Sequence, residues 1–154
     1  MSVELIRSSH SVGESNLHLQ LTPAYRCSIF EDEAVRILTR DYLAAAARKH
    51  KIEISAIGFG NDHVHLFVRN WKNFAIKDLA RLLKGFSSFM MRRHHWELFR
   101  KNLYGKKFWS AGYFYRTVGA VNSATVKKYV TESQDYGYEE SDFPKERNLI
   151  DFSV

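Results

Sequence analysis

Two histidines separated by one residue, His63-Val64-His65, could bind a divalent metal ion. The apolar, β-prone run Leu66-Phe67-Val68 follows them, and the turn-forming residues Gly60-Asn61-Asp62 precede them. Because side chains on a strand alternate between its two faces, both histidines would point to one face while Val64 enters the core. Spaced about 6–7 Å apart along the strand, the two imidazoles could converge on one ion. An isolated pair of this kind is more often two surface histidines on an edge strand. The rest of the sequence must therefore decide between a metal site and a pair of surface histidines.

The composition is that of one soluble domain. The chain has 154 residues, of which 45% are hydrophobic and 26% charged. It has 23 lysines and arginines against 17 acidic residues, a formal charge of +6 that would attract a polyanion such as nucleic acid, although the same charge can serve solubility alone. The single cysteine, Cys27, excludes a disulfide framework and a cysteine-based zinc site. Neither a membrane span nor a signal peptide is apparent, so we expect a cytoplasmic protein.

The hydrophobic pattern predicts which elements position the histidines. We predict strands at 16–21, 52–57, 63–68 and 108–118, the last broken by Gly112, and helices at about 31–51, 75–95 and 124–134, the last ended by Gly137. This order is typical of a ferredoxin-like α+β sandwich, an antiparallel sheet with helices on one face and the two histidines on the other. One domain is expected over 1–154, with irregular tails at 1–14 and 138–154.

Several other side chains could take part in chemistry or binding. His18 lies on the polar face of the first predicted strand, from which it could reach a site, although we expect it to be solvated. The segment 96–107 mixes aromatic and basic residues, which suits either base stacking with phosphate contact or rings packed inward. The polar side of the helix at 75–95 is almost uniformly basic, which favours a surface for a phosphate backbone; its residues are Lys77, Arg81, Lys84, Ser87, Ser88, Arg92 and Arg93.

Six segments together resemble one family. His63-Val64-His65 resembles the His-hydrophobic-His signature of HUH endonucleases, and Thr22-Pro23-Ala24-Tyr25-Arg26 resembles the Pro-Lys-Tyr-Arg segment of their smallest members. Lys84-Gly85-Phe86-Ser87-Ser88 resembles the Lys-Gly-x-Ser-Ser stretch of their second helix. The strand residues 108–109 and 117–119, followed by Val126-Lys127-Lys128-Tyr129-Val130, resemble their last strand and tyrosine helix. These segments cover roughly residues 16–134 and have the right order and spacing along the chain. Together they are similar to the single-tyrosine HUH transposases of IS200-like insertion sequences.

This resemblance implies a homodimer that cleaves and rejoins single-stranded DNA at the hairpin ends of its own mobile element. Tyr129 would be the nucleophile that forms a 5′-phosphotyrosine link, and His63 and His65 would hold Mg²⁺ or Mn²⁺. In the family, the tyrosine of one subunit commonly completes the histidine site of the other. The cations expected on the DNA are Lys84, Arg92, Arg93, Lys127 and Lys128.

The third metal ligand is left open. The family usually places a glutamine four residues after the tyrosine, where this chain has Ser133. Gln134 comes five residues after Tyr129, about 140° around an ideal helix. The candidate oxygen ligands are therefore Gln134, Ser133, Glu132 and Asp62. An oxygen ligand is expected because two histidines alone suit Zn²⁺ or Mn²⁺ better than Mg²⁺.

The proposed residue types suit phosphodiester cleavage. A phenol with a pKa near 10 is a weak nucleophile at neutral pH, and a charged phosphodiester repels it. A metal ion bound to the phosphate neutralises that charge and orients the phosphorus for in-line attack. Two alternatives remain: a nucleic-acid-binding ferredoxin-like domain without chemistry, and a metal-dependent phosphodiesterase that uses water instead of tyrosine.

Overall fold

Alternating leucines build the centre of the sheet. The computed structural model describes residues 6–7, 12–13, 16–103, 105–118, 128 and 135–144. Strand β3 (Asn16–Leu21) turns Leu17, Leu19 and Leu21 into the core, where all three are fully buried. His18 and Gln20 point to the opposite face, as the period of two requires.

The sheet has the ferredoxin-like order, which confirms the predicted fold class. Its five strands are antiparallel in the order β6-β3-β5-β4-β7, with β4 at Glu53–Phe59, β5 at Val64–Arg69, β6 at Phe114–Val118 and β7 at Tyr136–Glu139. Strands β4 and β5 form the predicted hairpin, and a β-bulge lies between Ile54 and Ala56. Two further short strands, β1 (Ile6–Arg7) and β2 (Val12–Gly13), pair only with each other.

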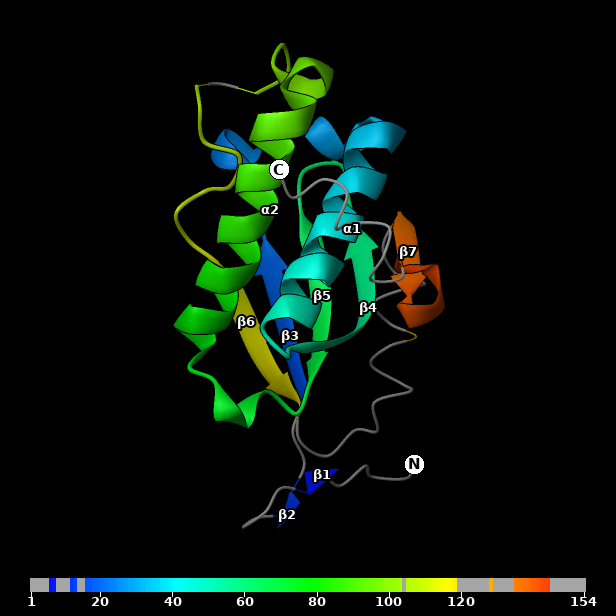
Figure 1. Ribbon diagram of the computed structural model, residues 1–154, viewed down its shortest axis with the longest axis vertical. Coiled ribbons are helices and arrows are strands. Elements are labelled where there is room, and N and C mark those ends of the chain that lie inside the picture. The colour runs from blue at the N-terminus through cyan, green and yellow to red at the C-terminus, as the bar shows by residue number, and fades with distance from the viewer. Residues whose placement is uncertain are drawn as a thin grey trace.

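Two helices cover one face of the sheet (Figure 1). Helix α1 (Glu33–Lys49) begins where the Asp32 side chain accepts a hydrogen bond from the Val35 amide at 3.1 Å. Helix α2 (Ile76–Phe99) extends four residues beyond its predicted end and buries one stripe against the sheet, namely Leu79, Ala80, Leu83, Met90 and Met91. The opposite face of the sheet is the one that bears His18 and His65. None of the helices in the described ranges is long and apolar enough to cross a membrane.

The predicted strand at 108–118 is wrong in its first half. Phe108 and Trp109 are buried, and the Trp109 indole donates a hydrogen bond to the Ser87 hydroxyl at 2.9 Å. Trp109 forms an isolated β-bridge with Pro23, where the Ala24 amide donates to the Phe108 carbonyl and the Ser110 amide to the Thr22 carbonyl, both at 2.9 Å, but no regular strand continues from it. The aromatic side chains therefore anchor a loop to α2, and regular pairing starts at Phe114.

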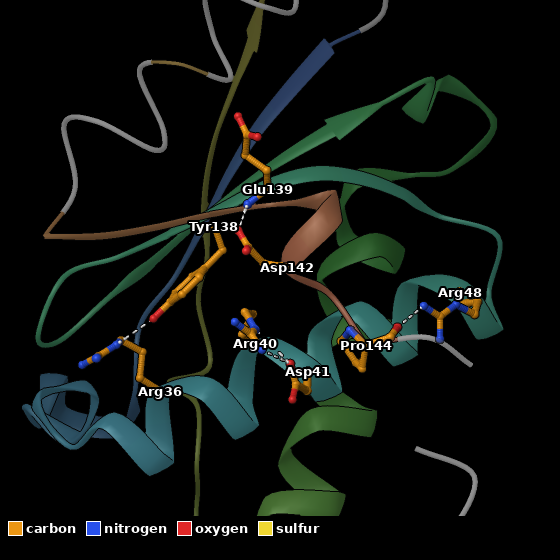
Figure 2. A network of polar contacts seen from close by, with 8 residues as sticks. All are labelled: Arg36, Arg40, Asp41, Arg48, Tyr138, Glu139, Asp142 and Pro144. Carbon is orange, nitrogen blue, oxygen red and sulfur yellow. Dashed lines mark hydrogen bonds and ion pairs between the residues drawn. The ribbon is translucent and has the colours of Figure 1, made fainter. Parts of the chain in front are cut away.

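Strand β7 corrects the prediction for the C-terminal part of the chain. The sequence predicts that Gly137 ends a helix and that 138–154 is an irregular tail; instead, Gly137 pairs with Gly58 of β4. The guanidinium of Arg36 on α1 lies 3.5 Å from the centre of the Tyr136 ring and donates to the Tyr138 hydroxyl at 3.1 Å. Figure 2 shows the hydrogen bond from Arg36 to the Tyr138 hydroxyl, together with the hydrogen bond from Arg48 to the Pro144 carbonyl. These contacts fix the edge strand to α1.

Candidate metal site and nucleic-acid surface

The hairpin between β4 and β5 brings His63 and His65 together. His65 lies in β5, opposite Gln20 of β3 and Gly58 of β4, whereas His63 stands just before the strand begins. The amide of Gly60 donates to the His63 carbonyl at 3.0 Å, which closes the turn. The two imidazole rings are 5.0 Å apart between centroids and nearly perpendicular, while Val64 between them is fully buried.

Asp62 holds the imidazole of His63. One carboxylate oxygen of Asp62 lies 2.9 Å from Nδ1 of His63, and the other lies 3.3 Å from Nε of Arg26. The hydrogen bond with His63, aided by the charge of Arg26, holds the pKa of Asp62 below its usual value, although partial burial opposes this. Asp62 is a candidate third ligand in the sequence, but here both of its oxygens have partners on the protein.

His18 contacts the other imidazole, contrary to the prediction that it is solvated. Its Nε2 lies 2.7 Å from Nδ1 of His65, with the ring centroids 4.6 Å apart. Burial lowers the pKa of His18, and the charge of Arg116 on β6 lowers it further. The one signal of this contact in the sequence is the spacing of two residues between His18 and Gln20. It places both side chains on the face of the sheet that carries His65.

The two contacts at Nδ1 leave Nε2 as the nitrogen by which each histidine would bind a metal ion. Burial, followed by the charges of His18 and His63, lowers the pKa of His65 to about 4, so this ligand is neutral at neutral pH. Two imidazole ligands fit Mn²⁺ better than Mg²⁺ and leave coordination positions for oxygen ligands. Within the described ranges, no group of three or more histidine, cysteine or acidic side chains could hold a metal ion. The residues thus fit an open two-histidine site that needs additional oxygen ligands.

Gly60 lies directly beneath the imidazole of His63. A Cβ atom at this position would lie 2.2 Å from Cε1, 2.7 Å from Nε2 and 2.8 Å from Nδ1 of the ring. Gly60 is part of the turn that the sequence predicts, and in the structure it also leaves room for the imidazole.

The proposed nucleophile lies outside the described residues, and so do Gln134, Ser133, Glu132 and Lys127. Lys128 is helical and exposed. The structure does describe the place where the chain continues after Tyr129. Tyr136, the first residue of β7, pairs with Phe59, and Phe59 pairs on its other side with Val64, the residue between the two histidines.

The cations on α2 differ in their surroundings. Arg92 and Arg93 are exposed, but the Lys84 ammonium donates to the carbonyls of Ala111 and Gly112 at 3.1 and 3.2 Å. Burial and the charge of Lys107 lower the pKa of Lys84. Lys84, Arg92 and Lys107 nevertheless line one hollow of about 270 Å³, which suits a phosphate group. Ser87, predicted on the polar side, is instead buried.

In the described part of the segment 96–107, the rings of Trp96 and Phe99 pack inward. Phe99 is buried and forms an edge-to-face contact with Phe108, at 5.2 Å between centroids. The basic side chains of this segment remain exposed: Arg100, Lys101, Lys106 and Lys107. These residues can therefore contribute charge to a nucleic-acid surface, while the buried aromatic residues cannot stack on a base.

Tyr25 is an exposed aromatic residue that sequence reasoning did not select for binding. Its side chain is 79% exposed, and both Tyr25 and Arg26 have left-handed backbone angles, with φ of 58° and 53°. This conformation is costly for residues other than glycine and is often found at functional sites. The tyrosine borders a hollow of about 770 Å³ that Arg26 and Lys101 also line. Because Arg26 contacts Asp62, this hollow adjoins the histidine pair.

Comparisons with known proteins identify the family of the chain and support its fold. The family described as "Transposase IS200 like" matches residues 11–133. A crystal structure from Deinococcus radiodurans R1, provisionally described as a transposase, is similar with 24% sequence identity and a TM-score of 0.65, covering 84% of this chain and 98% of that one. A REP-associated tyrosine transposase bound to a REP hairpin is similar with 14% identity and a TM-score of 0.52, covering 84% of this chain and 68% of that one. No curated protein matches the chain.

Proposed function

The chain belongs to the family of IS200-like transposases, and from this premise we propose that it cleaves and rejoins single-stranded DNA through a phosphotyrosine at Tyr129. His63 and His65 would hold the metal ion that assists the reaction, Mg²⁺ or Mn²⁺. The observation that carries this proposal is the pair of imidazoles at a 5.0 Å centroid separation, each with Nδ1 engaged by a neighbour. Second partners of this kind are typical of metal-binding histidines.

The proposed reaction exchanges one phosphodiester bond for another. The phenolic oxygen of Tyr129 attacks the phosphorus and loses its proton, the bond from phosphorus to the 3′-oxygen breaks, and that oxygen leaves as a 3′-hydroxyl. A 3′-hydroxyl of the strand to be joined then reverses the step and releases the tyrosine. Bound at the histidines, the ion would neutralise the charge of the scissile phosphate and orient it. His63 and His65 have the role of ligands, and Asp62 fixes His63.

The register of β7 supports the reach that this chemistry requires. Tyr129 precedes Tyr136 by seven residues, which span at most about 25 Å when fully extended and less when helical. Tyr136 pairs with Phe59 at the end of β4, next to the histidine hairpin, so the chain enters β7 at that end of the sheet. This entry point favours a phenol of the same subunit as the group that would attack at His63 and His65, and the arrangement shared between subunits is the second possibility.

The DNA would lie across the basic residues and Tyr25. Arg92, Arg93 and Lys128 are exposed cations, and Lys84 lines the hollow beside Arg92 with its ammonium group. We assign Lys127 to the same surface. A base of the single strand would stack on Tyr25, because exposed aromatic residues bind bases with little sequence preference. One of the similar structures is bound to a REP hairpin. We propose that this protein also binds a hairpin, namely the DNA hairpin at the end of its own mobile element.

One assay tests the nucleophile. A labelled single-stranded hairpin end is incubated with the protein and Mn²⁺, and the products are separated under denaturing conditions. We expect a covalent adduct that is lost in Tyr129→Phe and retained in Tyr136→Phe, the matched control. Adduct formation by Tyr129→Phe would show that another residue is the nucleophile. Cleavage without any adduct would indicate water as the nucleophile, and binding without cleavage would indicate a non-catalytic domain.

A second assay tests the metal ligands and the subunit arrangement. Replacing His63 or His65 by Ala should abolish cleavage, whereas full activity in both variants would exclude the proposed ligands. Mixing inactive His65→Ala protein with inactive Tyr129→Phe protein then tests the proposed homodimer. Recovered activity would mean that one subunit supplies the tyrosine and the other the histidines, and its absence would favour a site within one subunit.

A further inference from the structure

We propose that His18 is a positioning residue that accepts a hydrogen bond from Nδ1–H of His65 and thereby leaves the Nε2 lone pair of His65 for the metal ion. This inference rests on the metal role proposed above for His65. The observation behind it is the distance of 2.7 Å between Nε2 of His18 and Nδ1 of His65. The contact therefore involves Nδ1 of His65 and not its Nε2.

The hydrogen bond can have either direction, and only one direction is compatible with a metal ligand. If His18 donated, His65 would accept at Nδ1 and, as a neutral imidazole, would carry its proton on Nε2. Nε2 would then have no lone pair for an ion. If His65 donates from Nδ1, its Nε2 keeps the lone pair, and His18 carries its own proton on Nδ1. Metal-binding histidines usually donate their second ring N–H in this way.

The same logic already holds for His63, which strengthens the assignment. Its Nδ1 lies 2.9 Å from a carboxylate oxygen of Asp62, which can only accept. Both histidines are thus engaged at Nδ1, one by a carboxylate and the other by an imidazole. An imidazole acceptor orients His65 without adding a second negative charge, which would repel the phosphate of the substrate.

The sheet holds His18 in place for this role. Strand β3 is central, with β5 on one side and β6 on the other, and its core face is occupied by fully buried leucines. In the register of β3 and β5, Gln20 lies opposite His65 and His18 lies opposite Phe67. His18 is therefore the diagonal neighbour of His65 on the same face, at a separation that long or aromatic side chains bridge.

The tautomer can be observed directly in the metal-free protein. Long-range ¹H–¹⁵N correlation spectra of the histidine rings distinguish a protonated nitrogen from one with a lone pair. We expect Nδ1 of His65 to be protonated and Nε2 to carry the lone pair; the opposite assignment would overturn the proposal. This measurement needs neither DNA nor Tyr129, so it can fail while the transposase reaction stands.

Substitutions at His18 then test the consequence for the metal. His18→Gln retains an acceptor at nearly the same distance, whereas His18→Phe retains only the planar shape. We expect Mn²⁺, titrated by electron paramagnetic resonance, to bind His18→Phe about 10–100-fold more weakly than wild type and His18→Gln within about threefold of it. Equal weakening in both variants, or in neither, would show that His18 serves packing rather than positioning.

Discussion

Replacing Gly60 by alanine should displace one metal ligand without unfolding the protein. The new Cβ atom would lie 2.2 Å from Cε1 of His63, whereas ordinary contact begins at 3.4 Å. The imidazole must therefore move by roughly 1.2 Å or rotate away. The backbone does not oppose the change, since Gly60 is not among the described residues with positive φ. The perturbation is mainly a steric push on His63, whose ring supplies the three atoms nearest to the new Cβ atom.

The size of the effect follows from the surroundings of His63. Its side chain is 25% exposed, so it can swing outward into solvent at little packing cost. The swing breaks the hydrogen bond to Asp62, which contributes about 1 kcal/mol to stability. For the metal the consequence is larger, because a ligand displaced by more than 1 Å no longer converges with His65. We expect Mn²⁺ affinity to fall at least about 10-fold, as when a partner of a metal ligand is lost.

The assay combines Mn²⁺ titration with thermal unfolding of the metal-free protein. Gly85→Ala is the matched control, because a Cβ atom there meets nothing within 4 Å. Gly85 lies inside α2, so this control should gain about 0.5–1 kcal/mol of stability and keep wild-type Mn²⁺ affinity. Wild-type Mn²⁺ affinity in Gly60→Ala would refute the reasoning about His63.

Three further predictions concern pH, DNA and the edge strand. The unfolding free energy of the metal-free protein should fall as the pH drops from about 6.5 to about 4. Burial lowers the pKa of His65 in the folded protein to about 4, so in this range the unfolded chain binds more protons than the folded one. Melting temperatures should therefore decrease across this range, and they should decrease less steeply in His65→Gln. Tyr25→Ala should weaken binding of a thymidine 20-mer about 10-fold while Tyr25→Phe does not, and neither should alter binding of an abasic 20-mer. Tyr138→Phe should cost about 1–2 kcal/mol in urea unfolding, because the buried Arg36 loses an acceptor, whereas Tyr136→Phe keeps the stacked ring and should change stability by less than about 0.5 kcal/mol.

Local periodicity was sufficient to predict the elements that carry the histidines. The leucines of β3 alternate, the stripe of α2 repeats with helical spacing, and both patterns depend only on residues within one element. The histidine pair is equally local, because side chains that lie two residues apart at the end of a strand point to the same face of the sheet. These features could be predicted because each is decided by neighbours in the sequence.

Strand β7 could not be predicted in this way, because its stability comes from another element. Its four residues include Gly137, a poor strand former, and its first and third residues are the tyrosines that contact arginines on α1. Arg36 and Tyr138 are separated by 102 positions in the sequence. An edge strand held by such contacts has no periodic signature of its own.

The contact between His18 and His65 shows the same limit at the site itself. Alternation assigns His18 to a face of β3 but says nothing about which strand lies beside it or in which register. Moving the pairing of β3 and β5 by two residues would preserve every buried leucine and valine on the core side, yet it would place His18 opposite His65 or far from it. The partner of the metal ligand therefore depends on a register that the whole hairpin and both flanking strands establish together. His18 is 47 positions from His65 and occupies a position that is typical of a solvated side chain. Because its contact with His65 depends on this register, only the three-dimensional structure could identify it as part of the site.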